Sequence, residues 1–310
     1  MIPESPSLPK VEAAQLEDLA PAFRLVFQKC TAGDREMRVA NALELVRRKE
    51  LDPHGVLVVR GRSGLLGAML CVPIPGASGL VWPPQVVAQP AGGVQMEDLL
   101  AQACLQWLRG RGAKLAQALL FPEEAPLAAS LERNGFHHIT TLWYLRHSLD
   151  LSPEVLRAPE RLSYQTYADG DLALFEQTLL HTYEQSLDCP EVNGVREIGE
   201  ILAGHRGQGT FDPERWWLAQ ENGRPVGVLL MMELVDGQGW DLSYLGVVPA
   251  ARRRGVGREL TRRALVAARQ WGAFQLTLAV DARNLPAQDL YRSLGFEPLE
   301  QREVFLAFLR

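Results

Sequence analysis

The chain contains the segment Arg252-Arg253-Arg254-Gly255-Val256-Gly257, between a strand-like run that ends at Pro249 and an amphipathic run typical of a helix. Glycines let a backbone approach a ligand closely, and the first N–H groups of a helix attract anions because they lack partners within the helix. Arginine side chains add forked, charged donors at the same place. These features predict a turn that binds a pyrophosphate group; a basic surface turn is the simpler alternative.

A second motif follows downstream. It consists of Val280-Asp281-Ala282-Arg283-Asn284, then Ala287, then Leu290-Tyr291-Arg292-Ser293-Leu294-Gly295-Phe296. In this order the two motifs resemble those of the GNAT superfamily of N-acetyltransferases, whose acetyl-CoA loop has the pattern Gln/Arg-x-x-Gly-x-Gly/Ala. Arg252, Gly255 and Gly257 match that pattern. The resemblance implies acetyl-CoA as co-substrate and no metal ion, and it directly covers only the C-terminal part of the chain.

Bulk properties restrict the class of protein. The 310 residues suit two ordinary domains, and a net charge of −5 is a poor basis for binding nucleic acid. Four cysteines without metal-binding spacing fit a reducing compartment, and no apolar run approaches the roughly 20 residues that a membrane span needs. We expect a cytoplasmic protein with neither a nucleic-acid nor a membrane partner, and a homodimer is compatible with the sequence.

The chain repeats itself weakly. Residues 56–70 and 216–230 each predict a strand, a turn and a second strand, and Gly135-Phe136 matches Gly295-Phe296 in the later copy. The proline-containing segment 148–162 suits a linker.

We therefore predict the α+β class, with two tandem GNAT-like domains over residues 1–150 and 160–310, each a mixed, mostly antiparallel sheet flanked by helices. Where the second copy has its arginines, the first has residues 89–95 without arginine, and Leu131 stands at the place of Tyr291. The first domain is expected to be degenerate, with a structural or acceptor-shaping role. The layout is similar to that of the mycothiol synthases, but their acceptor chemistry has no separate signature here, so no thiol-sugar substrate is assigned.

The second domain shows a regular order of expected elements. These are a strand at 164–167, helices at 172–185 and 198–205, strands at 216–220, 226–234 and 242–248, a hairpin at 236–239, a helix at 256–271, a strand at 274–280, a helix after Asn284 and a strand at 303–308. Asn284 is predicted to cap its helix, with Pro286 in the first turn and Gly295 at the end.

The resemblance also implies how the carrier is held. In the family the strand before the turn bulges and splays from its neighbour, so that its backbone pairs with the pantetheine arm and the N–H of Val247 polarises the thioester carbonyl. The expected carrier-binding residues are Leu245, Gly246, Val247, Arg252, Arg253, Arg254, Gly255, Val256, Gly257, Arg258 and Asn284.

Two residues are predicted to transfer protons. Tyr291 is the candidate general acid for the thiolate leaving group, because a phenol with a pKa near 10 is a suitable donor; a core tyrosine is the alternative. Asp241 is the candidate base, acting through water, and a solvated carboxylate at a hairpin end is its alternative. Glu233 is the second choice, since Ala279 stands where other members carry a glutamate.

The acceptor is predicted only as an amine, of a small molecule or of a protein, that attacks the thioester directly. Segment 188–196 lies where the family builds its acceptor wall, and Asp188, Glu191 and Arg196 could bind a charged substrate, although a polar surface loop is equally consistent. The alternative to an enzyme is a non-catalytic acyl-CoA-binding sensor or assembly module. Such a protein would keep the glycine turn but would need neither Tyr291 nor a base.

Overall fold

The computed structural model describes residues 10–62, 64–87, 93–234, 237 and 239–309. The chain divides into two compact units, which we call the first unit (up to His138, together with Glu303 onward) and the second unit (Ile139–Arg302). Each unit therefore contains a strand-forming segment from the other half of the sequence. A division of the chain near residues 150–160 differs from the compact units at these two segments.

The first unit contains a sheet in the order β1-β2-β3-β4-β5-β12. Its strands are β1 (Val11–Ala13), β2 (Val56–Gly61), β3 (Gly64–Ile74), β4 (Ser78–Val86), β5 (Leu115–Leu120) and the end of β12 (Glu297–Phe308). The β4–β5 pair is parallel, whereas the other pairs in this order are antiparallel.

The second unit repeats this pattern in the order β7-β8-β9-β10-β11-β6. Its strands are β6 (His137–His147), β7 (Ser163–Thr166), β8 (Trp216–Glu221), β9 (Arg224–Glu233), β10 (Trp240–Val247) and β11 (Leu276–Asp281). Only β10–β11 is parallel among these described pairs, at the position of β4–β5. The predicted α+β class, with mixed and mostly antiparallel strand pairing in each unit, is confirmed.

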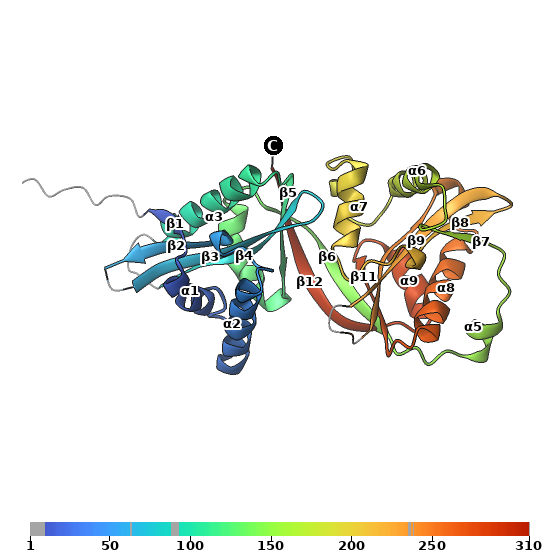
Figure 1. Cartoon of the computed structure of the whole chain (residues 1–310), viewed down its shortest axis with the longest axis horizontal. Coiled ribbons are helices and arrows are strands. Elements are labelled where there is room, and N and C mark those ends of the chain that lie inside the picture. The colour runs from blue at the N-terminus through green and yellow to red at the C-terminus, as the bar shows by residue number, and fades with distance from the viewer. Residues whose placement is uncertain (1–9, 63, 88–92, 235–236, 238, 310) are drawn as a thin grey trace, which may run out of the picture. The chain divides into compact units, whose positions relative to one another are not determined.

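Helices cover both faces of each sheet (Figure 1). The first unit has α1 (Leu19–Val26), α2 (Ala32–Arg47), α3 (Gly93–Gly110) and α4 (Ala129–Glu132). The second unit has α5 (Pro153–Arg157), α6 (Leu172–Tyr183), α7 (Ile198–Arg206), α8 (Val256–Gln270) and α9 (Leu285–Ser293). Within the described part of the chain, no helix has the length and apolar character needed to cross a bilayer.

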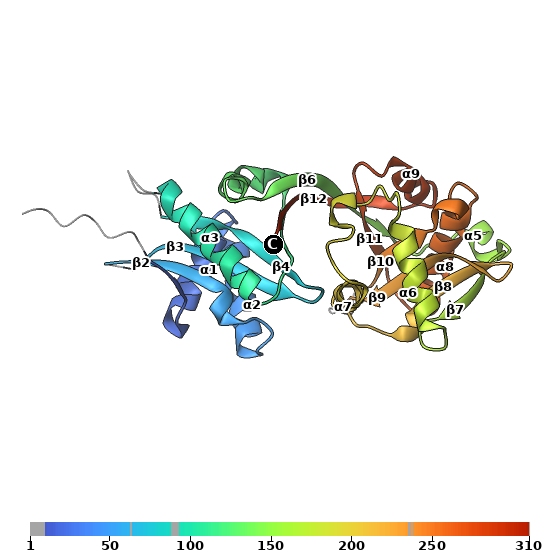
Figure 2. The ribbon, with the colours of Figure 1, turned by 90° about the horizontal axis from the view of Figure 1, so that it is seen from above.

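Alternating side chains explain why the sheet of the second unit is covered twice. Trp217, Leu229 and Met231 pack in a cluster with the apolar stripe of α8, whereas Trp216 and Leu230 pack with α6 and α7 on the opposite face. Figure 2 shows α6 lying across the strands on its face. Because successive strand residues point to opposite faces and both faces are covered, residues 216–219 of β8 and 226–232 of β9 form continuous buried apolar runs.

The predicted elements of the second domain are present with shifted ends. The strand expected at 303–308 begins earlier, at Glu297. Its first half was not predicted because the polar run from Glu297 to Arg302 lacks a strand-like apolar pattern. The segment predicted as a linker, 148–162, includes the short helix α5. Part of the predicted hairpin at 236–239 and residues 89–92 of the first domain lie outside the described residues.

Candidate active site

Strand β10 separates from its neighbour β11 and leaves an opening in the sheet for a ligand. Its register with β9 shifts between Leu242 and Tyr244, which places a bulge at Ser243. Its parallel pairing with β11 covers only Trp240 and Asp241, so the two strands separate beyond that point. The predicted bulge and splay are thus confirmed, and the β11-facing edge of β10 is open from Leu245 to Val247.

The basic turn has the backbone of an anion site. Gly255 caps α8 at φ 85°, a left-handed conformation that glycine adopts without steric cost, and Arg253 has φ 63°. Glu259 is the first residue of α8 whose N–H reaches a backbone carbonyl, that of Gly255 at 3.1 Å. Among the described residues, the N–H groups of Val256, Gly257 and Arg258 have no backbone partner in the turn.

A cavity of about 600 Å³ joins these two features. Its wall is formed by Leu245–Val247 of β10, by Gly255, Gly257 and Arg258 at the start of α8, and by Asn284 and Tyr291. A Cβ atom at Gly257 would lie 3.3 Å from Leu290 and 3.9 Å from Val247, both of which line the cavity. The absence of a side chain there keeps the helix start accessible, which fits a bound pyrophosphate.

The predicted arginines divide into different roles. Arg252 lines the cavity, but its guanidinium donates to the carbonyls of Val247 (3.0 Å), Thr182 (3.1 Å), Gln185 (3.0 Å) and Glu184 (2.6 Å). It therefore fastens the C-terminal end of α6 to β10, where helix carbonyls lack partners.

The remaining arginines of the turn differ in their partners. Arg254 pairs with Glu221 at 2.6 Å and does not line the cavity, and Val256 is buried in the core. Arg258 lines the cavity and donates to the hydroxyl of Ser293 at 2.6 Å. Arg253 is exposed at the cavity, and no partner holds its guanidinium among the described residues. Arg253 is thus the side chain most available to a phosphate.

Tyr291 projects from α9 into the wall of the same cavity. Its ring is 7 % exposed and packs 5.6 Å from that of Phe296. Burial, followed by the charge of Asp188, raises the pKa of the phenol, which therefore stays protonated at neutral pH. Asn284 caps α9 by accepting from the N–H of Ala287 at 3.3 Å, as predicted, and also lines the cavity.

Asp241 lies near the parallel pairing of β10 and β11, outside the residues that line the cavity. Burial raises the pKa of its carboxyl to about 6, although a hydrogen bond from Thr277 (2.6 Å) lowers it. Glu233 pairs with Arg215 at 3.2 Å and does not line the cavity either.

The acceptor segment contributes a different carboxylate. Asp188 lines the cavity, whereas Glu191 is held by Arg283 in two bonds of 2.6 and 3.0 Å. Arg196 is away from the cavity wall, and burial lowers the pKa of its guanidinium. Sequence reasoning did not assign Asp281, which accepts hydrogen bonds from Thr140 (2.6 Å) and from the backbone of Cys189 (3.0 Å). Its place directly after a buried strand was the available clue.

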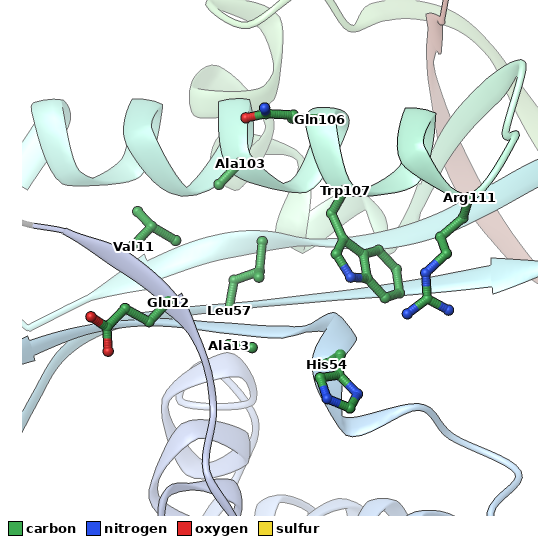
Figure 3. Close-up of a pocket in the computed structure, with 9 residues that line it drawn as sticks. All are labelled: Val11, Glu12, Ala13, His54, Leu57, Ala103, Gln106, Trp107 and Arg111. Carbon is green, nitrogen blue, oxygen red and sulfur yellow. The ribbon is translucent and has the colours of Figure 1, made fainter.

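The first unit has a hollow of about 260 Å³ beside Gln85 and Val86 of β4. Another, of about 450 Å³, lies between β1 and α3, with the Trp107 ring and Arg111 projecting toward His54 (Figure 3). The Arg111 guanidinium lies 4.7 Å from the Trp107 ring centroid and pairs with Asp52 at 2.9 Å. The lining includes no glycine turn at a helix start, so it offers no counterpart to the cavity of the second unit.

Comparisons with known proteins agree with this geometry. Residues 181–296 match the model of the Acetyltransferase (GNAT) family. The chain is 30 % identical over 240 residues to a mycothiol acetyltransferase of Beutenbergia cavernae, covering 69 % of this chain and 80 % of the relative.

Solved structures show the same fold. A GCN5-related N-acetyltransferase from Sphaerobacter thermophilus aligns with a TM-score of 0.61 at 21 % identity, covering 97 % of this chain and 96 % of that one. A tandem GNAT protein from the clavulanic acid biosynthesis pathway aligns with a TM-score of 0.50 at 15 % identity, covering 97 % and 99 %. With the motifs, the site and the relative of B. cavernae in agreement, this chain belongs to the GNAT family of acetyl-CoA-dependent N-acetyltransferases.

Proposed function

We propose that the cavity of the second unit is where this enzyme acetylates a primary amine, and that residues 160–310 form its catalytic domain. The proposal depends on two neighbouring features. The edge of β10 is open, and the first N–H groups of α8 have no backbone partner and are left accessible by the missing side chain of Gly257. Both features are needed at once, because one holds an extended acyl carrier and the other its phosphates.

Specific groups would hold the carrier. The backbone N–H groups at Val256, Gly257 and Arg258 suit the pyrophosphate, with the Arg253 guanidinium beside them. The backbone from Leu245 to Val247 suits the pantetheine arm, and the Val247 N–H is the proposed donor to the thioester carbonyl. Acetyl-CoA supplies an activated acyl group when bound; the protein orients it and excludes water.

Tyr291 is the proposed proton donor. Tyr291 lines the cavity, and its raised pKa keeps the phenol in the donating form across the neutral range. Asp241 is the predicted proton acceptor, but its place outside the cavity wall means that it would act through water. Positioned acids and bases each contribute about 10²- to 10⁴-fold in rate.

The relatives named mycothiol acetyltransferase support a mycothiol-related small molecule as the acceptor. The first domain, residues 1–150, is proposed to be degenerate, with a structural or acceptor-shaping role. A cytoplasmic location fits the four free thiols; a homodimer stays a prediction.

Two measurements test the function. Calorimetry should show saturable binding of acetyl-CoA, and chromatography should show amine-dependent release of CoA with glucosamine or Nα-acetyl-lysine methyl ester. Saturable binding without any amine-dependent release would favour a sensor.

Tyr291→Phe should reduce turnover by about 10²-fold or more while the Kd for acetyl-CoA stays nearly constant. Tyr164→Phe is the matched control, because this phenol also has no hydrogen-bond partner within the described part of the chain but does not line the cavity. Unchanged turnover in Tyr291→Phe would remove the general-acid role.

A further inference from the structure

We propose that the carboxylate of Asp188 binds the ammonium group of the acceptor inside the cavity and takes its proton. The inference rests on the proposed function, because it concerns the acceptor end of the same cavity. It assigns to the loop after α6 the proton transfer that the sequence suggested for Asp241.

The first support is the position of Asp188. Its side chain lines the cavity together with Tyr291, the proposed acid, and with Ser243 at the bulge of β10. One carboxylate oxygen accepts from the backbone N–H of Asp281 at 2.9 Å. Among the described residues, the other oxygen has no hydrogen-bond partner. A half-buried carboxylate with one oxygen fixed and one free can receive a cationic donor from the cavity.

The second support is that the loop holds this side chain rigidly. Gln185 and Cys189, on either side of Asp188, have positive φ values of 53° and 42°. The N–H of Cys189 donates to Asp281 at 3.0 Å, and the N–H of Asp188 itself donates to Ser186 at 3.1 Å. Left-handed backbone at non-glycine residues persists only where surrounding contacts enforce it, and such positions are frequent at functional sites.

The third support is the contrast between two neighbouring carboxylates. Side-chain oxygens of Asp188 and Asp281 lie within 4.8 Å of each other. Asp281 is fully buried, but hydrogen bonds from Arg283 and Thr140 outweigh that burial and hold its pKa at about 2. Burial, and then the negative charge of Asp281, raise the pKa of Asp188. The pair thus separates into one carboxylate held in its charged form and one carboxyl whose pKa is raised.

Other ionisable groups around Asp188 do not compete for that role. Tyr183 of α6, Tyr244 of β10 and Tyr291 of α9 are phenols whose pKa burial raises, so they stay neutral. Burial also raises the pKa of the Cys189 thiol, and Arg283 stays charged while paired with Glu191 and Asp281. Asp188 therefore differs from these neighbours as a carboxyl with a raised pKa that lines the cavity.

The proton moves from the substrate to the protein before the acyl group is transferred. An N–H bond of the bound ammonium breaks toward the free oxygen of Asp188, and the electron pair stays on nitrogen. The amine becomes neutral and can attack the thioester carbonyl, while the protonated carboxyl later releases its proton to water. Since lysine-type amines have pKa values near 10.4, the substrate arrives protonated and needs such an acceptor.

The test compares four variants by CoA release with glucosamine and Nα-acetyl-lysine methyl ester as acceptors. Asp188→Asn removes the base, Asp188→Glu keeps a carboxylate, and Asp241→Asn removes the rival base. Asp289→Asn is the matched control, since this exposed aspartate of α9 only pairs with Arg292. Acetyl-CoA binding is measured by calorimetry in each variant.

We expect Asp188→Asn to lose about 10²-fold or more in kcat, with a Kd for acetyl-CoA within about 2-fold of the parent and partial recovery in Asp188→Glu. Its rate should also rise about tenfold per pH unit up to the pKa of the free amine, because only neutral amine can then react, whereas the parent levels off at lower pH. A second measurement needs no acceptor. In protein labelled with ¹³C at aspartate, the carboxyl resonance of Asp188 is the one missing from Asp188→Asn, and it should titrate with a pKa above the usual range for aspartate.

The role of Asp188 would be overturned if Asp188→Asn kept the rate and the pH plateau of the parent while Asp241→Asn lost the rate and the plateau. The acetyltransferase activity of the parent enzyme would then still stand. An Asp188 resonance with an ordinary pKa would overturn the role of Asp188 as well.

Discussion

Gly257→Ala tests whether the start of α8 is the phosphate site, by adding one methyl group at its second residue. The added Cβ would lie 3.3 Å from Leu290 and 3.9 Å from Val247. The first contact is tight, but the partly buried Leu290 can move by a few tenths of an ångström. The backbone is not in the left-handed region at this position, so alanine introduces no backbone strain.

The expected effects on stability and binding have different sizes. Alanine in a helix is favoured over glycine by roughly 0.5–1 kcal/mol, which the tight contact partly cancels, so the free energy of unfolding should change by less than about 1 kcal/mol. A ligand held away from one N–H group loses a charge-assisted hydrogen bond of about 1.5–3 kcal/mol. The Kd for acetyl-CoA should therefore rise about 10- to 150-fold.

The assay pairs calorimetry with acetyl-CoA and denaturant unfolding. Gly199→Ala is the matched control, because Gly199 is likewise the second residue of its helix, α7, and has open space around its missing Cβ. The control should keep the parent Kd. If Gly257→Ala binds acetyl-CoA as tightly as the control does, the pyrophosphate does not lie against this helix start and the assignment of the site is wrong.

Further changes separate structural from binding roles. Arg252→Lys should lower the free energy of unfolding by about 1–3 kcal/mol in urea titrations, because a lysine cannot reach the carbonyls that Arg252 holds at the end of α6. Arg253→Gln should leave that free energy unchanged and raise the Kd for acetyl-CoA about 3- to 10-fold, with a weaker salt dependence. The pKa of Asp241 is raised from its usual 3.8 to about 6, so protonation favours the folded state. Its contribution of at most about 3 kcal/mol is present below pH 3.8 and lost as pH rises through 6; Asp241→Asn should flatten stability over this window, and an unchanged slope would contradict the burial argument.

Much of the fold could be predicted from the sequence because the features that indicate its strands, turns and helix ends are local. The continuous apolar runs in β8 and β9, the glycine turn at Gly255 and the cap at Asn284 each depend on neighbours within a few positions. Such features leave periodic or compositional traces in the chain.

The exchange of strand-forming segments between the units could not be predicted in that way. β6 precedes the linker but pairs with β11, and the end of β12 pairs with β5. Both arrangements preserve the apolar pattern of each strand, so periodicity does not distinguish them. The side-chain roles of the arginines were inaccessible for a related reason, because the partners of Arg252 at the end of α6 are far away in sequence.

The two units also show how a shared sheet can keep or lose a ligand site. Gln85 of β4 and Gly246 of β10 occupy equivalent positions in the two units. Gln85 pairs with Ala68 and precedes Val86, just as Gly246 pairs with Val228 and precedes Val247. A Cβ atom at Gly246 would lie 2.6 Å from the Cβ of Thr182, so the second unit requires glycine there. In the first unit the corresponding Gln85 is 4 % exposed and accepts a hydrogen bond of 2.8 Å from Gln28.

At a hollow of about 260 Å³ beside this strand, the two amides bind each other as a pair. A carrier arm could displace it only by leaving buried amides without partners, at a cost of about 1–3 kcal/mol for each unpaired group. The strand order, the parallel pair and the two-sided core do not depend on that substitution, because they are built from the alternating apolar residues of the strands. The β4–β5 pairing likewise covers only Ser78 to Leu80, so the first unit keeps the open strand edge, and the paired amides near it are what distinguishes this unit from the second.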